Sequence, residues 1–187
     1  MTGTARGRPL DATRDAAILD ATANLLSEVG WDRLTMRAVA ERAGVSLATI
    51  YRRWDTKTEL ALAALDSVLA TLVDESLVSI SELLARRSDL IPSVLALQRA
   101  EPGLRDVIRG RFIDPVMTPL EAQVRARARK PLDDDLVSLI ALVGPALLMA
   151  RAVFFNKAPD LDTVKQIERL VDGLVDAATA AVTDCRH

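Results

Sequence analysis

Apolar residues recur at the spacing of an α-helix along nearly the whole chain. Ile18, Leu25 and Val29 fall on one helical face, and later stretches repeat the pattern as far as residue 183. Strand-like alternation of β-branched residues with polar ones is absent. The sequence therefore predicts an all-α fold.

Glycines and prolines divide the helical pattern into segments. Gly30 fits the position just after a helix, where a positive φ favours glycine. Pro115 and Pro119 should kink or split the stretch that contains them, because proline lacks a backbone donor and clashes with the preceding turn. The expected helices are 11–29, 36–43, 47–54, 56–72, 75–87, 90–100, 103–129, 133–155 and 161–183.

Two residue types that common site chemistry needs are nearly missing. The one cysteine, Cys185, and the one histidine, His187, lie in the last three positions. A disulfide within the chain is impossible, and structural zinc takes four ligands. There is no G-x-G-x-x-G or Walker-type loop. We therefore expect no metal, no cofactor and no enzymatic activity.

The chain also lacks the signals of a membrane or secreted protein. The N-terminus is polar and charged, without the apolar region of a signal peptide. The apolar run from Leu136 to Ala150 is shorter than the roughly 18–20 residues that span a bilayer, which favours a buried helix. The cysteine content fits a reducing compartment. We expect a cytoplasmic protein with no membrane partner.

The segment from Thr35 to Trp54 has the pattern of two short helices joined by a tight turn. Thr35 and Ser46 are suited to cap the two helices, and Gly44 ends the first of them. Small apolar residues between the helices allow the close packing that such a turn requires. This is the helix-turn-helix pattern, in which the second helix enters the major groove of DNA.

The charge of this region differs from that of the whole chain. From Arg33 to Lys57, six Lys/Arg residues oppose only Glu41 and Asp55, a balance of about +4, whereas the chain carries −2. The remainder therefore carries about −6. Such asymmetry indicates a nucleic-acid-binding face on an otherwise acidic protein.

The stretch from Ile18 to Leu60 resembles the DNA-binding domain of the TetR family of bacterial transcriptional regulators. Trp54 stands where the family usually has Phe, and Arg53 where His is common. The C-terminal two thirds resemble the family's effector domain in length and helicity. The matching residues are Ile18-Leu19, Ala21, Leu25, Gly30, Thr35, Val39-Ala40, Ala43-Gly44-Val45-Ser46, Thr49-Ile50-Tyr51, Trp54, Lys57 and Leu60.

The resemblance implies an organisation in three parts. These are a flexible basic arm over 1–10, a three-helix, homeodomain-like helix-turn-helix domain over 11–57, and a helical effector-binding and dimerisation domain over 58–187. For the effector domain the resemblance implies an architecture and not a ligand. The leading hypothesis is a homodimeric repressor that binds a palindromic double-stranded DNA operator and is released by a small, largely apolar effector.

Ten residues are the expected DNA contacts. The resemblance implies that Thr35 and Tyr51 reach phosphates, and Lys57 at the start of the next helix should do the same. Of the adjacent Arg52 and Arg53 only one can read bases, and Arg52 is preferred because it lies nearer the outer face. The full set is Thr35, Arg37, Ser46, Leu47, Ala48, Thr49, Tyr51, Arg52, Arg53 and Lys57.

The effector pocket is expected around the proline-containing stretch, because bulky, adaptable side chains gather there. Pockets of this kind are mostly apolar with few polar groups. An ordinary helical core is the competing interpretation, and Arg151 is expected to pair with Asp172 or Asp176. The candidate ligand residues are Leu65, Leu69, Leu97, Gln98, Arg111, Phe112, Met117, Leu147 and Arg151.

The last two helices carry more apolar residues than one helical hairpin can bury. Two such helices from each subunit would form a four-helix bundle across a two-fold axis. The candidate interface residues are Leu136, Leu139, Ile140, Leu147, Val164, Ile167, Leu170, Val171 and Leu174.

Two other classes of function stay open at this point. An apolar-ligand carrier could use the helix-turn-helix only for packing, but it would not need the basic excess at Arg37, Arg52, Arg53 and Lys57. An enzyme would need a nucleophile with a base, or a metal site. The run Asp133-Asp134-Asp135 is more simply a helix-capping feature.

Overall fold

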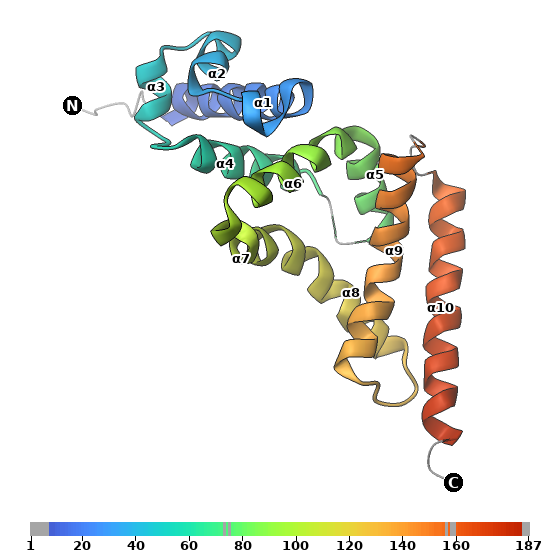
Figure 1. Cartoon of the computed structure of the whole chain (residues 1–187). Helices are drawn as coiled ribbons and strands as arrows, with labels where there is room; N and C mark the ends of the chain where they lie inside the picture. The colour runs from blue at the N-terminus through green and yellow to red at the C-terminus, as the bar shows by residue number, and fades with distance from the viewer. Residues whose placement is uncertain (1–7, 73, 75, 156, 158–159, 185–187) are drawn as a thin grey trace, which may run out of the picture. The chain divides into compact units, whose positions relative to one another are not determined.

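The computed structural model describes residues 8–72, 74, 76–155, 157 and 160–184. Within these residues all regular elements are helical, which confirms the all-α prediction (Figure 1). The chain forms two compact units. The first comprises the residues up to Thr71 together with Leu90–Glu101, and the second comprises Leu72–Asp89 and the residues from Pro102 onward.

The first unit is built around the long helix α1. Its helices are α1 (Arg8–Arg33), α2 (Met36–Ala43), α3 (Leu47–Tyr51), α4 (Lys57–Leu69) and α6 (Ile91–Ala100). Gly30 interrupts α1 with φ 80°, as expected of a glycine at a helix end. The largest fully buried side chains of this unit are Ile18, Leu34, Val39, Ile50, Leu60 and Leu97.

Helix α6 belongs to this first unit although it lies some 20 residues beyond α4 in the sequence. The Ser93 hydroxyl donates to the Leu26 carbonyl of α1 at 2.5 Å. The Thr58 hydroxyl of α4 donates to Glu101 Oε1, also at 2.5 Å. The compact unit thus extends past residue 57. The predicted division at residue 57, between the DNA-binding domain and the effector domain, stays a prediction.

Most of the expected N-terminal arm, residues 1–7, lies outside the described residues. Helix α1 begins at Arg8, so residues 8–10 are helical, and the arm stays a prediction. Pro9 is compatible with this start, because a proline in the first helical turn lacks an N–H that would have no partner there anyway.

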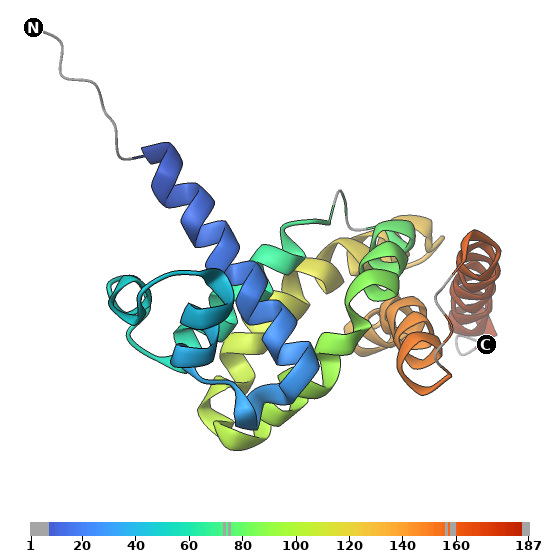
Figure 2. The same ribbon diagram turned by 90° about the horizontal axis from the view of Figure 1, so that it is seen from above.

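The second unit places two long helices side by side. Its α-helices are α5 (Leu77–Arg87), α7 (Arg105–Ile108), α8 (Asp114–Arg127), α9 (Asp134–Phe154) and α10 (Leu161–Asp184). Helices α9 and α10 run antiparallel and stay adjacent in both views (Figures 1 and 2). The core lies between these two helices, α5 and α8, and includes Leu77, Ile80, Leu120, Val124, Val137, Ile140, Leu148, Val164, Ile167, Val171 and Val175.

The stretch around the two prolines is split, as the sequence predicts. A π-helical turn over Arg109–Ile113 separates α7 from α8. Pro115 then lies in the first turn of α8, where its missing donor is tolerated, and Pro119 stays inside the helix. Short 3₁₀ turns at Ser88–Leu90 and Pro102–Leu104 complete the connections.

Helix α9 is longer than its apolar run suggests. It has 21 residues, and its most apolar 18-residue window has a mean hydropathy of 2.1, which satisfies the length and composition of a membrane span. The apolar run from Leu136 to Ala150 is shorter than a membrane span, but α9 continues beyond it at both ends. The length of the run therefore does not by itself exclude a span. Of that window, 28 % is buried within this chain, and the exposed apolar residues of α9 include Leu139, Leu142, Leu147 and Met149.

Candidate nucleic-acid interface

The sequence-predicted caps fix the geometry of α2, the turn and α3. The Ala38 N–H donates to Thr35 Oγ1 at 3.1 Å, and the Thr49 N–H donates to Ser46 Oγ at 3.2 Å. Gly44 closes α2 with φ 66°, in the left-handed region that favours glycine. These contacts are local in sequence, and together they set the angle between the two short helices.

Helix α3 has one buried and one exposed face. Ile50 is completely buried against the first unit's core. On the other face Leu47 is 38 % and Tyr51 49 % exposed, and Ala48 is exposed as well. Ser46 and Thr49 bond each other at 2.8 Å through their hydroxyls. An exposed face of small, aromatic and hydroxyl groups suits close approach to a DNA groove.

Arg52 and Arg53 follow α3, which ends at Tyr51, earlier than the expected end at 54. Arg52 is its C-cap and is exposed. Arg53 turns the other way: its side chain is only 16 % exposed and pairs with Asp15 of α1. Of the two arginines, Arg52 is therefore the one whose side chain is presented to solvent beside the exposed face of α3.

The remaining predicted contacts surround this face. Thr35 and Arg37 are both exposed at the start of α2. Arg37 pairs with Glu41 at 3.1 Å, a solvated pair of the kind worth about 0.3–0.5 kcal/mol, which a phosphate can replace.

Lys57 is held more firmly than a surface lysine. Its ammonium donates to the Trp31 carbonyl at 3.0 Å and lies 4.0 Å from the centroid of the Trp31 ring. Trp31 is buried, as expected of a core residue. An ammonium has three donors, and the Trp31 carbonyl takes one of them.

Two acidic residues of α1 are part of this surface, and sequence reasoning missed both. Glu28 accepts two bonds from Arg42, at 2.9 and 2.7 Å, and the Arg42 guanidinium lowers the pKa of that carboxyl. Asp15 pairs with Arg53. Two of the six cations between Arg33 and Lys57, Arg42 and Arg53, are thus paired with acids from outside that stretch. A count along the sequence could not find partners 14 and 38 positions away.

The nine candidate ligand residues are divided between the two units. Leu65, Leu69, Leu97 and Gln98 belong to the first, and the others to the second. Phe112 is buried, and the exposed Arg111 guanidinium lies 5.9 Å from the centroid of the Phe112 ring. Met117 packs against the second unit's core. The set stays a prediction.

Arg151 does not have the partners expected for it. Asp172 pairs instead with Arg127 at 3.6 Å. The charge of Arg151 contributes to lowering the pKa of Asp160, after the larger effect of hydrogen bonds from Thr163. Asp160 precedes α10, so the positive charge of Arg151 acts at the start of that helix and not along it.

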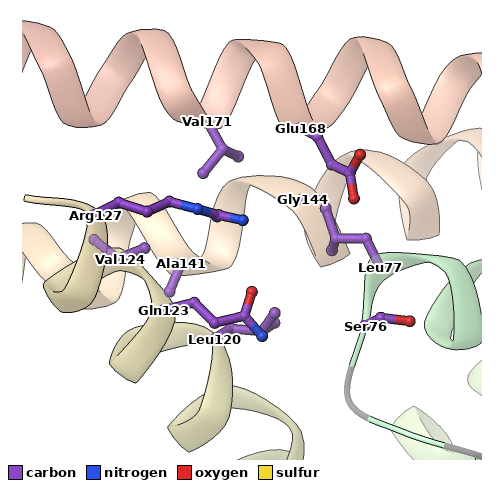
Figure 3. A pocket seen from close by; sticks show the side chains of 10 residues that line it. All are labelled: Ser76, Leu77, Leu120, Gln123, Val124, Arg127, Ala141, Gly144, Glu168 and Val171. Atoms are coloured by element: carbon purple, nitrogen blue, oxygen red, sulfur yellow. The ribbon is translucent and has the colours of Figure 1, made fainter.

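A small pocket of about 60 Å³ lies elsewhere in the second unit, between α5, α8, α9 and α10 (Figure 3). Its walls combine apolar side chains with polar ones, and the guanidinium of Arg127 and the carboxylate of Glu168 both point into the gap. None of the nine candidate ligand residues lines it. The volume holds about two water molecules, too little for an apolar effector.

Gly144 lines this pocket at a point where a larger residue would require the Leu77 side chain to move. A Cβ there would lie 2.7 Å from Leu77 Cδ2 and 2.9 Å from Cδ1. The missing side chain therefore lets α5 approach α9 at this point.

The nine candidate dimer residues fall into two groups. Ile140, Val164, Ile167 and Val171 are buried in the core of their own chain, because α9 and α10 pack on each other and on α5 and α8. They have no surface left for a second copy. The exposed group consists of Leu139, Leu147, Leu170 and Leu174, while Leu136 is half-buried.

Comparison with known proteins agrees with this architecture. Residues 18–64 match the family model described as bacterial regulatory proteins, tetR family. An uncharacterized HTH-type transcriptional regulator of Mycobacterium tuberculosis is 31 % identical over 190 residues, covering 90 % of this chain and 91 % of that protein. The DNA-binding transcriptional repressor TetR of Mycobacteroides abscessus is 34 % identical over 180 residues, covering 87 % and 92 %.

Solved structures share the fold at lower identity. A TetR family transcription regulator from Marinobacter aquaeolei superposes with a TM-score of 0.60 at 18 % identity, over 89 % of this chain and 97 % of that one. The multidrug binding protein EbrR, in complex with imidazole, gives 0.54 at 19 % identity, over 84 % and 94 %. The relatives match over nearly their whole length, with the helix-turn-helix in its expected place. The chain belongs to the tetR family of bacterial regulatory proteins and is a helix-turn-helix transcriptional regulator.

Proposed function

We propose that this regulator is an effector-responsive repressor that binds a palindromic DNA operator as a homodimer. The observation that carries the proposal is the exposed face of α3, which follows a capped turn and lies opposite the buried Ile50. The relative from Mycobacteroides abscessus is named a DNA-binding transcriptional repressor, which supports the same direction of control.

In this proposal α3 lies in the major groove, and its exposed groups contact the base edges. Arg52 donates two bonds to a guanine, and the apolar side chains of Leu47 and Ala48 meet thymine methyl groups. The Tyr51 hydroxyl and the N-terminus of α2, with Thr35 as its cap, bind phosphates on either side. The pairing of Arg53 with Asp15 supports Arg52 as the base-reading residue.

The second copy is expected to cover the outer face of α9 and α10. The exposed apolar residues of this face are Leu139, Leu142, Leu147, Met149, Leu170 and Leu174. Isologous pairing of two helices from each subunit makes a four-helix bundle, which buries these side chains of both subunits. The same cover accounts for the apolar surface of α9 without a membrane.

The effector is proposed to act by favouring one conformation of the dimer. A ligand releases DNA only if it binds the non-DNA conformation more tightly than the DNA-bound one. A shift of α4 between the effector domain and α3 is the expected link, since a change in spacing between the two recognition helices lowers the fit to successive grooves. A structural neighbour, EbrR, is described as a multidrug binding protein, which supports a small-molecule effector.

Three variants test the DNA contacts, each measured on the operator, on operators altered at single base pairs and on an unrelated duplex. Arg52→Ala should cost about 1–3 kcal/mol per base contact and relax specificity at one symmetric pair of positions. Lys57→Ala should weaken binding to all sequences alike and flatten the salt dependence by about one unit per half-site. Tyr51→Phe should act like Lys57→Ala but more mildly, since a hydroxyl releases no counterion.

Arg99→Ala serves as the matched control, because Arg99 is an exposed arginine on α6 of the same unit. It should leave operator affinity unchanged. If the quadruple variant lacking the positive charges of Arg37, Arg52, Arg53 and Lys57 still bound duplex DNA as the wild type does, the proposal would fail, and the ligand-carrier function would replace it.

A further inference from the structure

We propose that Asp15 limits the strength of DNA binding by holding Arg53 away from the DNA backbone. The inference rests on the proposed DNA-binding function and adds a residue to it. Asp15 lies near the start of α1, 38 positions before Arg53 in the sequence, and the two side chains form an ion pair. The pair stands directly beside Tyr51 and Arg52, the exposed end of the recognition helix.

The burial of the two partners is unequal. The Arg53 side chain is 16 % exposed, whereas that of Asp15 is 38 % exposed. The Arg53 side chain is thus mostly covered. The Asp15 side chain is the more exposed of the two, although its Oδ1, which faces Arg53, is itself buried. A phosphate can accept two bonds from a guanidinium, but a guanidinium that keeps its carboxylate partner is not available to it. The pair therefore keeps Arg53 out of the phosphate contacts, beside the exposed end of the recognition helix.

The consequence appears in the counterions that binding releases. Each phosphate neutralised by a free cation contributes about 0.9 to the slope of log affinity against log salt concentration. An arginine that keeps its carboxylate partner neutralises no phosphate. Arg53 consequently adds nothing to the slope in the wild-type protein, although the sequence counts it among the cations of the site.

The effect is independent of DNA sequence, because phosphate contacts carry no base information. Removing the carboxylate should strengthen binding to the operator and to an unrelated duplex by the same factor. Asp15 in this role sets how tightly the protein holds any DNA, while Arg52 sets which DNA it prefers.

Asp15→Asn tests the inference on the full-length protein. Binding to the operator and to an unrelated duplex of equal length is measured by fluorescence anisotropy over a range of salt concentrations. The salt slope should steepen by about 0.9 per half-site, close to two units per dimer, on both duplexes. The double variant Asp15→Asn with Arg53→Gln keeps the wild-type net charge and should restore the wild-type slope.

Asp20→Asn is the matched control, because it removes the same charge from the same helix. Asp20 is exposed and accepts a bond from Asn24, one turn further along α1. It should leave the slope unchanged. An equal steepening in this control would mean that any lost negative charge has the effect, and the inference would be overturned.

A purely structural role of the pair gives the opposite result. If Asp15 only fastens α3 to α1, then Asp15→Asn lowers the melting temperature and weakens DNA binding without steepening the slope, and the inference is wrong. Should the asparagine variant fail to fold, Asp15→Ser removes the same charge and is measured in its place. Salt-dependent binding by the wild type with an unchanged slope in Asp15→Asn refutes this inference alone, whereas no binding by the wild type refutes the DNA-binding proposal.

Discussion

The helix-turn-helix region and the α9–α10 pair both leave one helical face uncovered, but the two faces have opposite chemistry. Around α3 the exposed groups are Arg52, the Tyr51 ring and hydroxyl, and the hydroxyl-capped start of α2. Along α9 and α10 they are leucines such as Leu139 and Leu170, 64 % and 48 % exposed. Exposed apolar surface on this scale marks an interaction site.

The difference shows that each region completes its structure with a different partner. The charged face needs a polyanion, and its salt dependence follows from counterion release. The apolar face needs another apolar surface, for which a second copy of the same two helices is the simplest source. DNA binding by the charged face should therefore depend on salt concentration, and dimerisation through the apolar face should depend on its leucines.

The largest effect should come from placing charge on the apolar face. The double variant Leu139→Asp with Leu170→Asp puts carboxylates where the partner's leucines would lie, and burying an unpaired charge is costly. We expect the dimer dissociation constant to rise more than about 100-fold, equivalent to about 2.7 kcal/mol. Sedimentation equilibrium measures this, and operator binding should fall with it.

Leu95→Asp is the control for that variant. Leu95 is 52 % exposed on α6, so it matches the exposure of the targeted leucines but lies in the first unit. It should stay dimeric. A double variant that remained a dimer at micromolar concentration would remove α9 and α10 from the interface.

A substitution on the inner face of α9 should instead lower the folding stability of each subunit. Ile140 is 4 % exposed inside the chain's own core, next to Leu139 in sequence. Ile140→Ala should lower the free energy of unfolding by about 2–5 kcal/mol through lost burial and a cavity. Denaturant titration measures the loss, analysed over a concentration series so that dimer dissociation is separated. A loss below about 1 kcal/mol would contradict the placement of this face.

A smaller effect is expected where α5 approaches α9. The Cβ of Gly144→Ala would meet the Leu77 side chain at 2.7 Å, and overpacking typically costs about 1–3 kcal/mol. Leu77→Ala should abolish the penalty at Gly144 if the close contact causes it.

The smallest effect should come from the cap of α2. Thr35→Ala removes the acceptor of the Ala38 N–H and should cost about 1 kcal/mol of stability. Thr35→Ser keeps the hydroxyl and should retain most of it. Thermal unfolding distinguishes the two variants, and equal melting temperatures would show that the cap contributes nothing.

The two regions also differ in how much of them the sequence predicts. Thr35, Gly44 and Ser46 act within four residues of their own positions, so a local pattern is enough to place α2, the turn and α3. The same locality gives Gly30 its place at the end of a helix. Local hydrogen bonding and backbone preference decide these features, and both are written in neighbouring residues.

Features that depend on distant residues escape this reasoning. The periodicity of α9 and α10 indicates helices, but it does not tell which leucines face their own core and which face a partner. Ile140 and Leu139 are adjacent, and only the packing of α5 and α8 distinguishes them. The pairing of Asp15 with Arg53 likewise depends on how the chain after α3 packs against α1. The effector residues are the hardest case, because a pocket is formed by several helices at once.

Selection of bound duplexes from a random pool tests the central claim most directly. The full-length wild-type protein is incubated with the pool at physiological salt, and the retained sequences are read. We expect a palindrome whose half-sites are centred about 34–36 Å apart, one turn of DNA, as two α3 helices in successive major grooves require. Arg52→Ala should lose preference at one symmetric pair of positions within it. Retained duplexes with no shared sequence, or a single half-site without symmetry, would contradict the account.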